Sequence, residues 1–147
     1  LKRDVVTVLR TNVDDVTGEQ LAFALELMME EGALDVTAIP CIMKKGRPAT
    51  VVEVMCEAHD EERLAKLLMT TTGSLGVRVT RTPRLILPRD FVEVHCSFGV
   101  ITMKVSEAGA TAEYEECARA ARQAGVSVHE VVSAARDAYR AAQEGDE

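Results

Sequence analysis

Two hydrophobic periodicities alternate along the first 88 residues. Strand-like segments are expected at 4–11, 34–42, 50–57 and 77–87, and helices at 17–32 and from about 60 to 70. The order strand, helix, strand, strand, helix, strand is the βαββαβ pattern of ferredoxin-like α+β folds. Right-handed crossovers then place the four strands in the order fourth, first, third, second.

Residues 89–147 are expected to add a β-hairpin and two helices. Period-two segments at 91–96 and 100–105 flank Ser97–Gly99, a loop is expected at 106–111, helices are expected at about 114–125 and from Ser127, and an acidic tail should fray from Gln143. We therefore expect a ferredoxin-like core at 1–88 and a hairpin-plus-helix extension at 89–147, together in one compact unit. Small residues dominate the last helices, so their packing must be close or shared with another subunit. The scarcity of aromatic residues favours an oligomer.

Composition excludes several classes of function. A net charge of −7 over 147 residues argues against nucleic acid as a partner, because duplex binding needs a broad basic face. No apolar run reaches the length of a membrane span, and no signal peptide is expected. The four cysteines are widely separated, which indicates reduced thiols in the cytoplasm. Because the chain starts at Leu1, we expect it to be part of a longer protein.

A cluster of cations lies between the second and third predicted strands. Lys44, Lys45 and Arg47 surround Gly46 in a short turn. Cations on such a loop, where glycine lets the backbone come close, suit a phosphate chain. The alternative is a solvated basic turn. A hairpin centred on Gly46 would place Cys41 opposite Val51.

The predicted topology brings this turn together with two other polar loops. The first strand ends at residues 12–15, where Asp14 and Asp15 offer the carboxylate oxygens that Mg²⁺ or Mn²⁺ prefers. The alternative is that Asp15 starts a helix and Asp14 is solvated. These two loops and the loop after the second helix are expected at the same edge of the sheet. This arrangement predicts a pocket for a metal-bound polyphosphate.

The third loop follows the second helix. Thr70, Thr71 and Thr72 offer hydroxyl donors, and Gly73 exposes backbone N–H groups. The alternative is an ordinary polar helix end. Arg78, at the start of the fourth strand, adds a further positive charge.

Several of these segments also carry a resemblance to a known family. They are Thr11–Gln20, Gly32–Val36, Met43–Pro48, Thr70–Thr72 continuing through Leu75–Arg78, and Glu113–Glu115. In this order they resemble motifs in the C-terminal half of the LarC nickel-insertion proteins, which mature the nickel-pincer nucleotide cofactor of lactate racemase. The resemblance spans nearly the whole chain. One departure is Thr111–Ala112, where relatives commonly carry Lys-Pro.

The resemblance implies a CTP-dependent cyclometallase, a lyase that inserts Ni²⁺ into pyridinium-3,5-bisthiocarboxylic acid mononucleotide. It implies a ferredoxin-like C-terminal domain that forms hexamers and binds CTP with Mn²⁺ or Mg²⁺. By position, the turn Lys44–Arg47 and Arg78 would contact the nucleotide, Thr70–Thr72 would form part of the pocket wall, and Asp14 and Asp15 would hold the metal.

The nickel-handling, histidine-rich part of such proteins belongs to the other half. His59, His95 and His129 are scattered without the spacing of metal ligands. We therefore expect this chain to bind nucleotide without turnover on its own, and the sequence identifies no catalytic residue. Two other functions stay open, a small-ligand regulatory module and an assembly domain whose basic loop contacts an acidic partner.

Overall fold

A computed structural model of the chain describes residues 1–144. The first part contains β1 (Lys2–Val13), α1 (Gly18–Glu30), β2 (Asp35–Met43), β3 (Arg47–Cys56), α2 (Glu61–Thr72) and β4 (Arg78–Ile86), with short 3₁₀ turns η1 (Lys44–Gly46) and η2 (Ala58–Asp60). The second contains β5 (Arg89–Cys96), β6 (Gly99–Ser106), β7 (Gly109–Ala112), α3 (Tyr114–Ala124) and α4 (Val128–Glu144). Of the expected acidic tail, residues 145–147 lie outside the described residues. None of the described helices is long and apolar enough to span a membrane.

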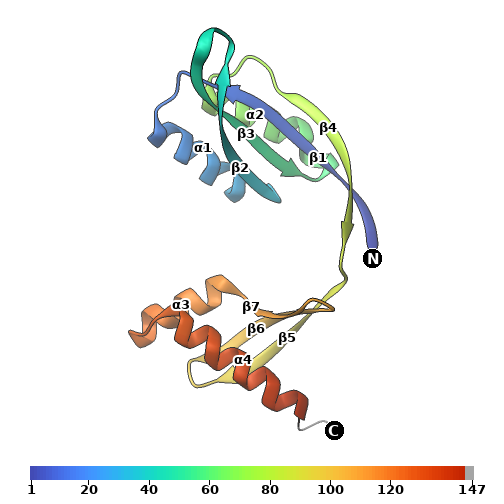
Figure 1. Ribbon diagram of the computed structural model, residues 1–147, viewed down its shortest axis with the longest axis vertical. Helices are drawn as coiled ribbons and strands as arrows, with labels where there is room; N and C mark the ends of the chain where they lie inside the picture. The colour runs from blue at the N-terminus through green and yellow to red at the C-terminus, as the bar shows by residue number, and fades with distance from the viewer. Residues whose placement is uncertain (145–147) are drawn as a thin grey trace. The chain divides into compact units, whose positions relative to one another are not determined.

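The four-stranded sheet has the order β2-β3-β1-β4, so the predicted ferredoxin-like topology is confirmed (Figure 1). Strand β3 pairs antiparallel with β1 on one side and with β2 on the other. Strand β3 can enter between β1 and β2 because the α1 crossover leaves the space of one strand between them. The second sheet is a three-stranded meander with the order β5-β6-β7.

The chain divides into two compact units. One is residues 3–85, and the other is residues 86–147 together with residues 1 and 2. The division lies close to the boundary expected after residue 88. The expectation that both parts form a single compact unit stays a prediction, and each unit is described below by itself.

The core of the first unit lies between the sheet and its two helices. Alternate residues of β1 and β3 face α1 and α2, as strand geometry requires. The fully buried residues of this layer include Leu9, Val52, Val54, Met28, Leu64 and Leu68. Burial of each such side chain contributes about 1.5–3 kcal/mol to folding, so this layer holds the helices against one face of the sheet. The opposite face carries polar side chains between its apolar ones.

Helix α1 begins as the sequence predicted. Thr17 is the N-cap, its hydroxyl accepts from the backbone N–H of Gln20, and the Gln20 side chain accepts from the backbone N–H of Thr17. This reciprocal capping box satisfies two N–H groups that the first helical turn leaves unpaired. Asp15 is therefore not the capping residue.

The register of the β2–β3 hairpin differs from the one expected. Met43 pairs with Arg47, which centres the turn on Lys45 and places Cys41 opposite Ala49 instead of Val51. The reason is the tight turn η1, in which both Lys45 (φ 64°) and Gly46 (φ 70°) adopt left-handed conformations. These two residues reverse the chain early enough for β3 to begin at Arg47.

Residues expected to form a loop contain a strand. Strand β7 pairs antiparallel with β6 from Met103 opposite Ala112 to Ser106 opposite Gly109. It has only four residues, which is too short for a clear hydrophobic alternation in the sequence. The loop predicted at 106–111 was therefore wrong over most of its length.

The core of the second unit is built largely from small side chains. One face of the β5-β6-β7 sheet packs against α3 and α4. Its buried residues are Val94, Ile101, Met103, Ala112, Cys117, Ala120, Ala121, Val131 and Ala135. Burial raises the pKa of the Cys117 thiol, which keeps this thiol protonated and unreactive.

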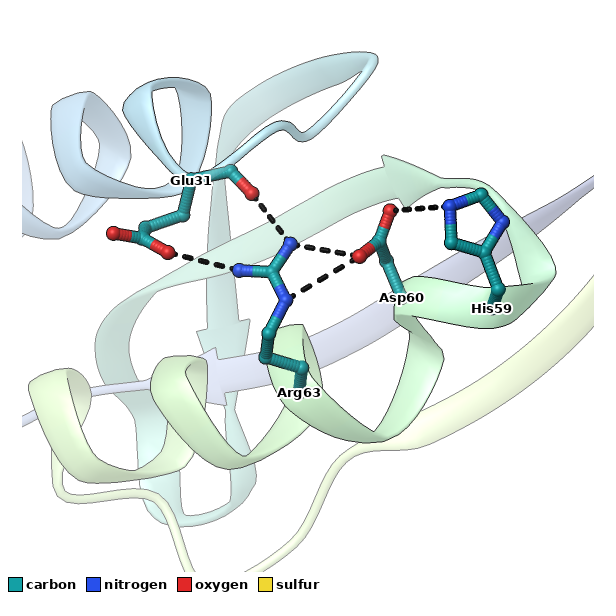
Figure 2. Close-up of polar contacts among 4 residues, drawn as sticks. All are labelled: Glu31, His59, Asp60 and Arg63. Atoms are coloured by element: carbon teal, nitrogen blue, oxygen red, sulfur yellow. Dashed lines mark hydrogen bonds and ion pairs between the residues drawn. The ribbon is translucent and has the colours of Figure 1, made fainter.

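Arg63 connects the end of α1 to the beginning of α2 (Figure 2). Its Nη2 donates to the backbone carbonyl of Glu31 at 2.7 Å and to Asp60 Oδ1 at 2.7 Å, and its Nη1 donates to Glu31 Oε2 at 2.9 Å. The hydrogen bond from Arg63 lowers the pKa of the Asp60 carboxyl. His59 Nε2 lies 3.2 Å from the other oxygen of Asp60. One guanidinium thus satisfies a helix-end carbonyl and two carboxylates.

We predict that Arg63→Lys lowers the urea midpoint of unfolding, because an ammonium group cannot reproduce the planar fork that reaches Glu31 and Asp60 together. The pKa of Asp60 is lower in the folded than in the unfolded state. Its contribution to stability is therefore present above the unfolded pKa and is lost as pH falls through the folded pKa. The difference in urea midpoint between Arg63→Lys and the wild type should therefore become smaller as pH falls through that range. Arg122 lies on the exposed surface of α3. Arg122→Lys is the control and should change neither the urea midpoint nor its dependence on pH.

Candidate functional site

The tip of the β2–β3 hairpin presents two lysines with no carboxylate partner. Lys44, Lys45 and Gly46 are all exposed, and neither lysine forms an ion pair with any residue that the structure describes. Lys45 is also the one non-glycine residue with a positive φ among residues 1–144. Such a conformation costs on the order of 1 kcal/mol for a residue with a side chain. The fold thus holds an unpaired cation at a strained position.

Arg47 lies beside this tip and contacts the end of β1. Its Nε is 3.0 Å from Asp14 Oδ2, and the Asp14 side chain is only 18% exposed. The pair forms because β1 and β3 are antiparallel neighbours, with Val13 opposite Thr50. The charge of Arg47 is therefore balanced within the protein, whereas the charges of Lys44 and Lys45 are not.

The segment after α2 also meets the end of β1. The hydroxyl of Thr11, a buried residue, donates to the carbonyl of Gly76 at 3.0 Å. Arg78 Nη2 donates to Asn12 Oδ1 at 2.6 Å. The three polar segments therefore lie at one edge of the sheet, as the topology predicted. The ligands assigned to their residues stay predictions.

The threonines at the end of α2 do not present free hydroxyl protons to this edge. Thr70 and Thr71 both donate to the carbonyl of Leu67, and the buried Thr72 donates to the carbonyl of Leu68 at 2.7 Å. Hydroxyls near a helix end commonly bond to the carbonyl one turn earlier. In this arrangement their donors are already used, so an anion would depend on the lysines and on backbone groups.

The carboxylates at this edge could contribute to a metal site but do not complete one. Asp14 uses one oxygen for Arg47, and Asp15 is exposed. Among residues 1–144 no group of three or more His, Cys, Asp or Glu side chains is arranged to hold a metal ion. Mg²⁺ and Mn²⁺ are often held by one or two carboxylates together with the phosphates of a nucleotide. The residues present fit that arrangement and do not form an all-protein cage.

A groove that the sequence analysis did not predict lies on the face of the sheet away from the helices. It has a volume of about 390 Å³ and is lined by Val8, Arg10, Glu53, Met55, Arg78, Thr80 and Thr82. Arg10 and Glu53 are opposite each other in the β1–β3 register and form an ion pair. The sequence signal for this groove was the period-two alternation of side chains along each strand, which determines the side chains on the face away from the helices. It could be used only after the register between the strands was known.

Comparison with known proteins identifies the family of the chain. The family of nickel insertion proteins matches residues 1–132. The pyridinium-3,5-bisthiocarboxylic acid mononucleotide nickel insertion protein of Acetivibrio thermocellus is 33% identical over 148 residues, covering 98% of this chain and 36% of that protein. A relative from Methanococcoides burtonii is 39% identical, covering 93% of this chain and 37% of that protein. The chain belongs to the nickel insertion protein family and spans a little over a third of the length of these relatives.

Solved structures agree with this assignment. The C-terminal domain of a cyclometallase involved in the synthesis of the NPN cofactor of lactate racemase, in its apo form, superposes with a TM-score of 0.84 and 34% identity. The match covers 95% of this chain and 99% of that domain. A protein from Methanopyrus kandleri superposes with a TM-score of 0.62 and 27% identity, covering 93% and 90% of the two chains.

We predict that Thr11→Val destabilises the first unit by about 0.5–1.5 kcal/mol, because it removes the hydrogen bond from the buried Thr11 to the Gly76 carbonyl while preserving side-chain shape. Thr70→Val is the matched control, since the Thr70 hydroxyl is exposed and bonds only within its own helix. Urea unfolding of both variants measures the difference. Equal stability of the two variants would show that the Thr11 bond does not hold the loop after α2.

Proposed function

We propose that this chain is the nucleotide-binding part of a nickel-insertion enzyme and that it binds CTP with a divalent cation at the edge formed by β1, η1 and the loop after α2. In this proposal the full protein is a CTP-dependent cyclometallase, of the lyase class, that inserts Ni²⁺ into pyridinium-3,5-bisthiocarboxylic acid mononucleotide. The observation that carries it is the pair of unpaired lysines in a chain of net charge −7. Membership in the nickel insertion protein family supports nickel insertion as the reaction.

The lysines are the residues best placed to hold a phosphate chain. Lys44 and Lys45 project from a turn with a left-handed backbone, and no carboxylate competes for them among the described residues. Charge-assisted contacts to phosphate are about twice as strong as neutral hydrogen bonds. Gly46 lets the backbone approach the ligand closely. Arg78 adds a third cation at the start of β4.

The Asp14–Arg47 pair couples the cation to the phosphates. Asp14 would supply an oxygen to Mg²⁺ or Mn²⁺, and Arg47 would then be free to contact a phosphate. Asp15 is the second candidate ligand. A bound divalent cation would neutralise phosphate charge. Asp14 would then lie beside the cation and Arg47 beside a phosphate, so each would keep an opposite charge next to it. The metal and the nucleotide should therefore bind cooperatively.

Nickel is the substrate metal and not a resident of this chain. We propose that nickel handling belongs to the rest of a longer protein, since this chain spans a little over a third of the length of its relatives. We accordingly propose that the chain alone binds nucleotide without turnover, and we assign no catalytic residue in it. We place the protein in the cytoplasm, as a homo-oligomer with hexamers as the specific proposal.

An assembly role is the second candidate, and exposed apolar side chains favour it. Phe23 of α1 is 60% exposed, and Ile42 of β2 is 71% exposed. Contiguous exposed apolar patches are typical of protein contacts, and these two side chains are the candidates for such a patch on this unit. As an assembly module, the basic tip would bind an acidic partner and CTP would not bind. Calorimetry with CTP and Mn²⁺ therefore separates the two functions.

We predict that the wild-type chain binds CTP in the presence of Mn²⁺ by calorimetry and that Lys44→Ala combined with Lys45→Ala abolishes this binding. Each charge-assisted contact should contribute on the order of 1.5–3 kcal/mol, or about tenfold or more in Kd. The melting temperature should stay nearly unchanged, because the tip is exposed. Lys2→Ala combined with Lys66→Ala removes the same charge elsewhere and should bind CTP normally. Absence of heat with any nucleotide would reject the proposed function.

We predict further that Asp14→Asn lowers the factor by which Mn²⁺ strengthens CTP binding, while affinity in EDTA is unchanged or higher. The reason is that the amide removes a metal ligand and also frees Arg47. Asp15→Asn tests the second candidate and should have the smaller effect, because Asp15 does not contact Arg47. Both affinities are measured with and without Mn²⁺. If neither variant alters the metal dependence, the cation is held by phosphates and water alone.

A further inference from the structure

The second unit has a pocket of its own between the β5–β6 turn and α3, called the α3 pocket below. Its volume is about 370 Å³, and it is lined by Phe98, Gly99, Val100, Ile101, Glu116, Arg119, Ala120 and Gln123. Pockets for small molecules have volumes of about 300–1,000 Å³, so the size suits a small ligand. All the lining residues belong to the second unit. The α3 pocket is therefore separate from the edge assigned to the nucleotide.

One wall of the α3 pocket is a stretch of β6 with no strand beside it. Strand β7 ends at Ala112, and the chain then turns into α3. The first residue of β6 beyond the end of β7 is Thr102. Its carbonyl accepts from the N–H of Glu113 at 2.8 Å, and its N–H donates to Glu116 Oε2 at 2.6 Å. The start of α3 thus takes the place of a strand at Thr102, and it goes no further along β6.

Val100 lies two residues before Thr102 and has its backbone open on the same side. In an antiparallel pair, alternate residues of a strand direct their N–H and C=O groups to the same neighbour. Gly99 and Ile101 therefore bond to β5, and Val100 points its N–H and C=O toward the α3 pocket, as Thr102 does toward α3. Outside strand pairing, no residue among 1–144 forms a backbone hydrogen bond with Val100. The pocket wall thus offers one backbone donor and one backbone acceptor.

Two opposite charges of α3 lie beside this open edge. Glu116 is held in place, because its Oε2 accepts from the Thr102 N–H and its Oε1 accepts from the Thr102 hydroxyl at 3.1 Å. Each carboxylate oxygen has capacity for a second hydrogen bond. Arg119 lines the pocket one turn later, is exposed, and forms no ion pair with the residues that the structure describes. The pocket therefore presents a fixed anion and an unpaired cation.

We propose that the α3 pocket binds a free α-amino acid with an apolar side chain. The ammonium group of the ligand donates to the Val100 carbonyl and to Glu116. Its carboxylate accepts from the Val100 N–H and from the guanidinium of Arg119, and charge-assisted hydrogen bonds of this kind are the strong ones. The ligand side chain lies against Phe98 and Ala120. The open edge is one residue long, which fits a single amino acid and not an added strand.

Equilibrium dialysis of the 147-residue chain with L-leucine, L-methionine and L-phenylalanine tests the proposal. At least one of the three should bind saturably, at one site per chain. The amide and N-acetyl derivatives of the tightest ligand each lack one of its two charges. Each derivative should bind at least about tenfold more weakly, because it loses a charge-assisted contact. Absence of binding by all three amino acids, or equal binding of either derivative, would overturn the proposal.

Two variants on α3 show whether the binding occurs in this pocket. Arg119→Gln should weaken the amino acid by about tenfold or more and leave the melting temperature unchanged, since Arg119 is exposed and without an ion-pair partner among residues 1–144. Arg122→Gln removes the same charge from exposed α3 surface outside the pocket and should bind normally. Equal affinity of the two variants would overturn the proposal. CTP binding is measured separately, so the result does not depend on the proposed function.

Discussion

The pairing of β3 with β1 in the middle of the first sheet positions the two charged pairs next to which the candidate site lies. It places Val13 opposite Thr50 and so brings Arg47 within 3.0 Å of Asp14. The same pairing aligns Arg10 with Glu53 on the opposite face. The apolar layer beneath the helices fixes this register, because a shift by one residue would turn the core side chains outward. The edge and the groove are therefore two consequences of one strand pairing.

Electrostatics explain how an acidic chain can present a site for an anion. Most arginines of the first unit are balanced by neighbouring carboxylates, as in Arg63 with Asp60 and Arg84 with Asp4. Exposed ion pairs of this kind contribute little to stability. Their opposite charges nevertheless largely cancel, so the pair exerts little electrostatic field at a distance. Lys44 and Lys45 differ because no carboxylate reaches the hairpin tip among residues 1–144. Local geometry, and not net charge, thus decides where an anion is attracted.

Alternation and capping made much of the first unit predictable. The strand order, the capping box at Thr17 and the meeting of three loops all followed from local patterns and the handedness of crossovers. The hairpin register was wrong by two residues because Lys45 adopts a left-handed conformation that residues other than glycine, asparagine and aspartate seldom adopt. Strand β7 was missed because four residues carry too little pattern. The threonine hydroxyls at the end of α2 were expected to be free, and their bonds to the helix backbone are visible only in three dimensions.

The sequence by itself determined the order of elements, the excess of cations at one turn and the family, since these depend on residues close together in the chain. Tertiary structure alone decided which charges are balanced. Asp14 and Arg47 are 33 positions apart in the numbering, and Arg10 and Glu53 are 43 apart, so no local pattern reveals either pair. Whether a charged group is available to a ligand depends on its nearest opposite charge in space, and the pairing of the strands determines that distance.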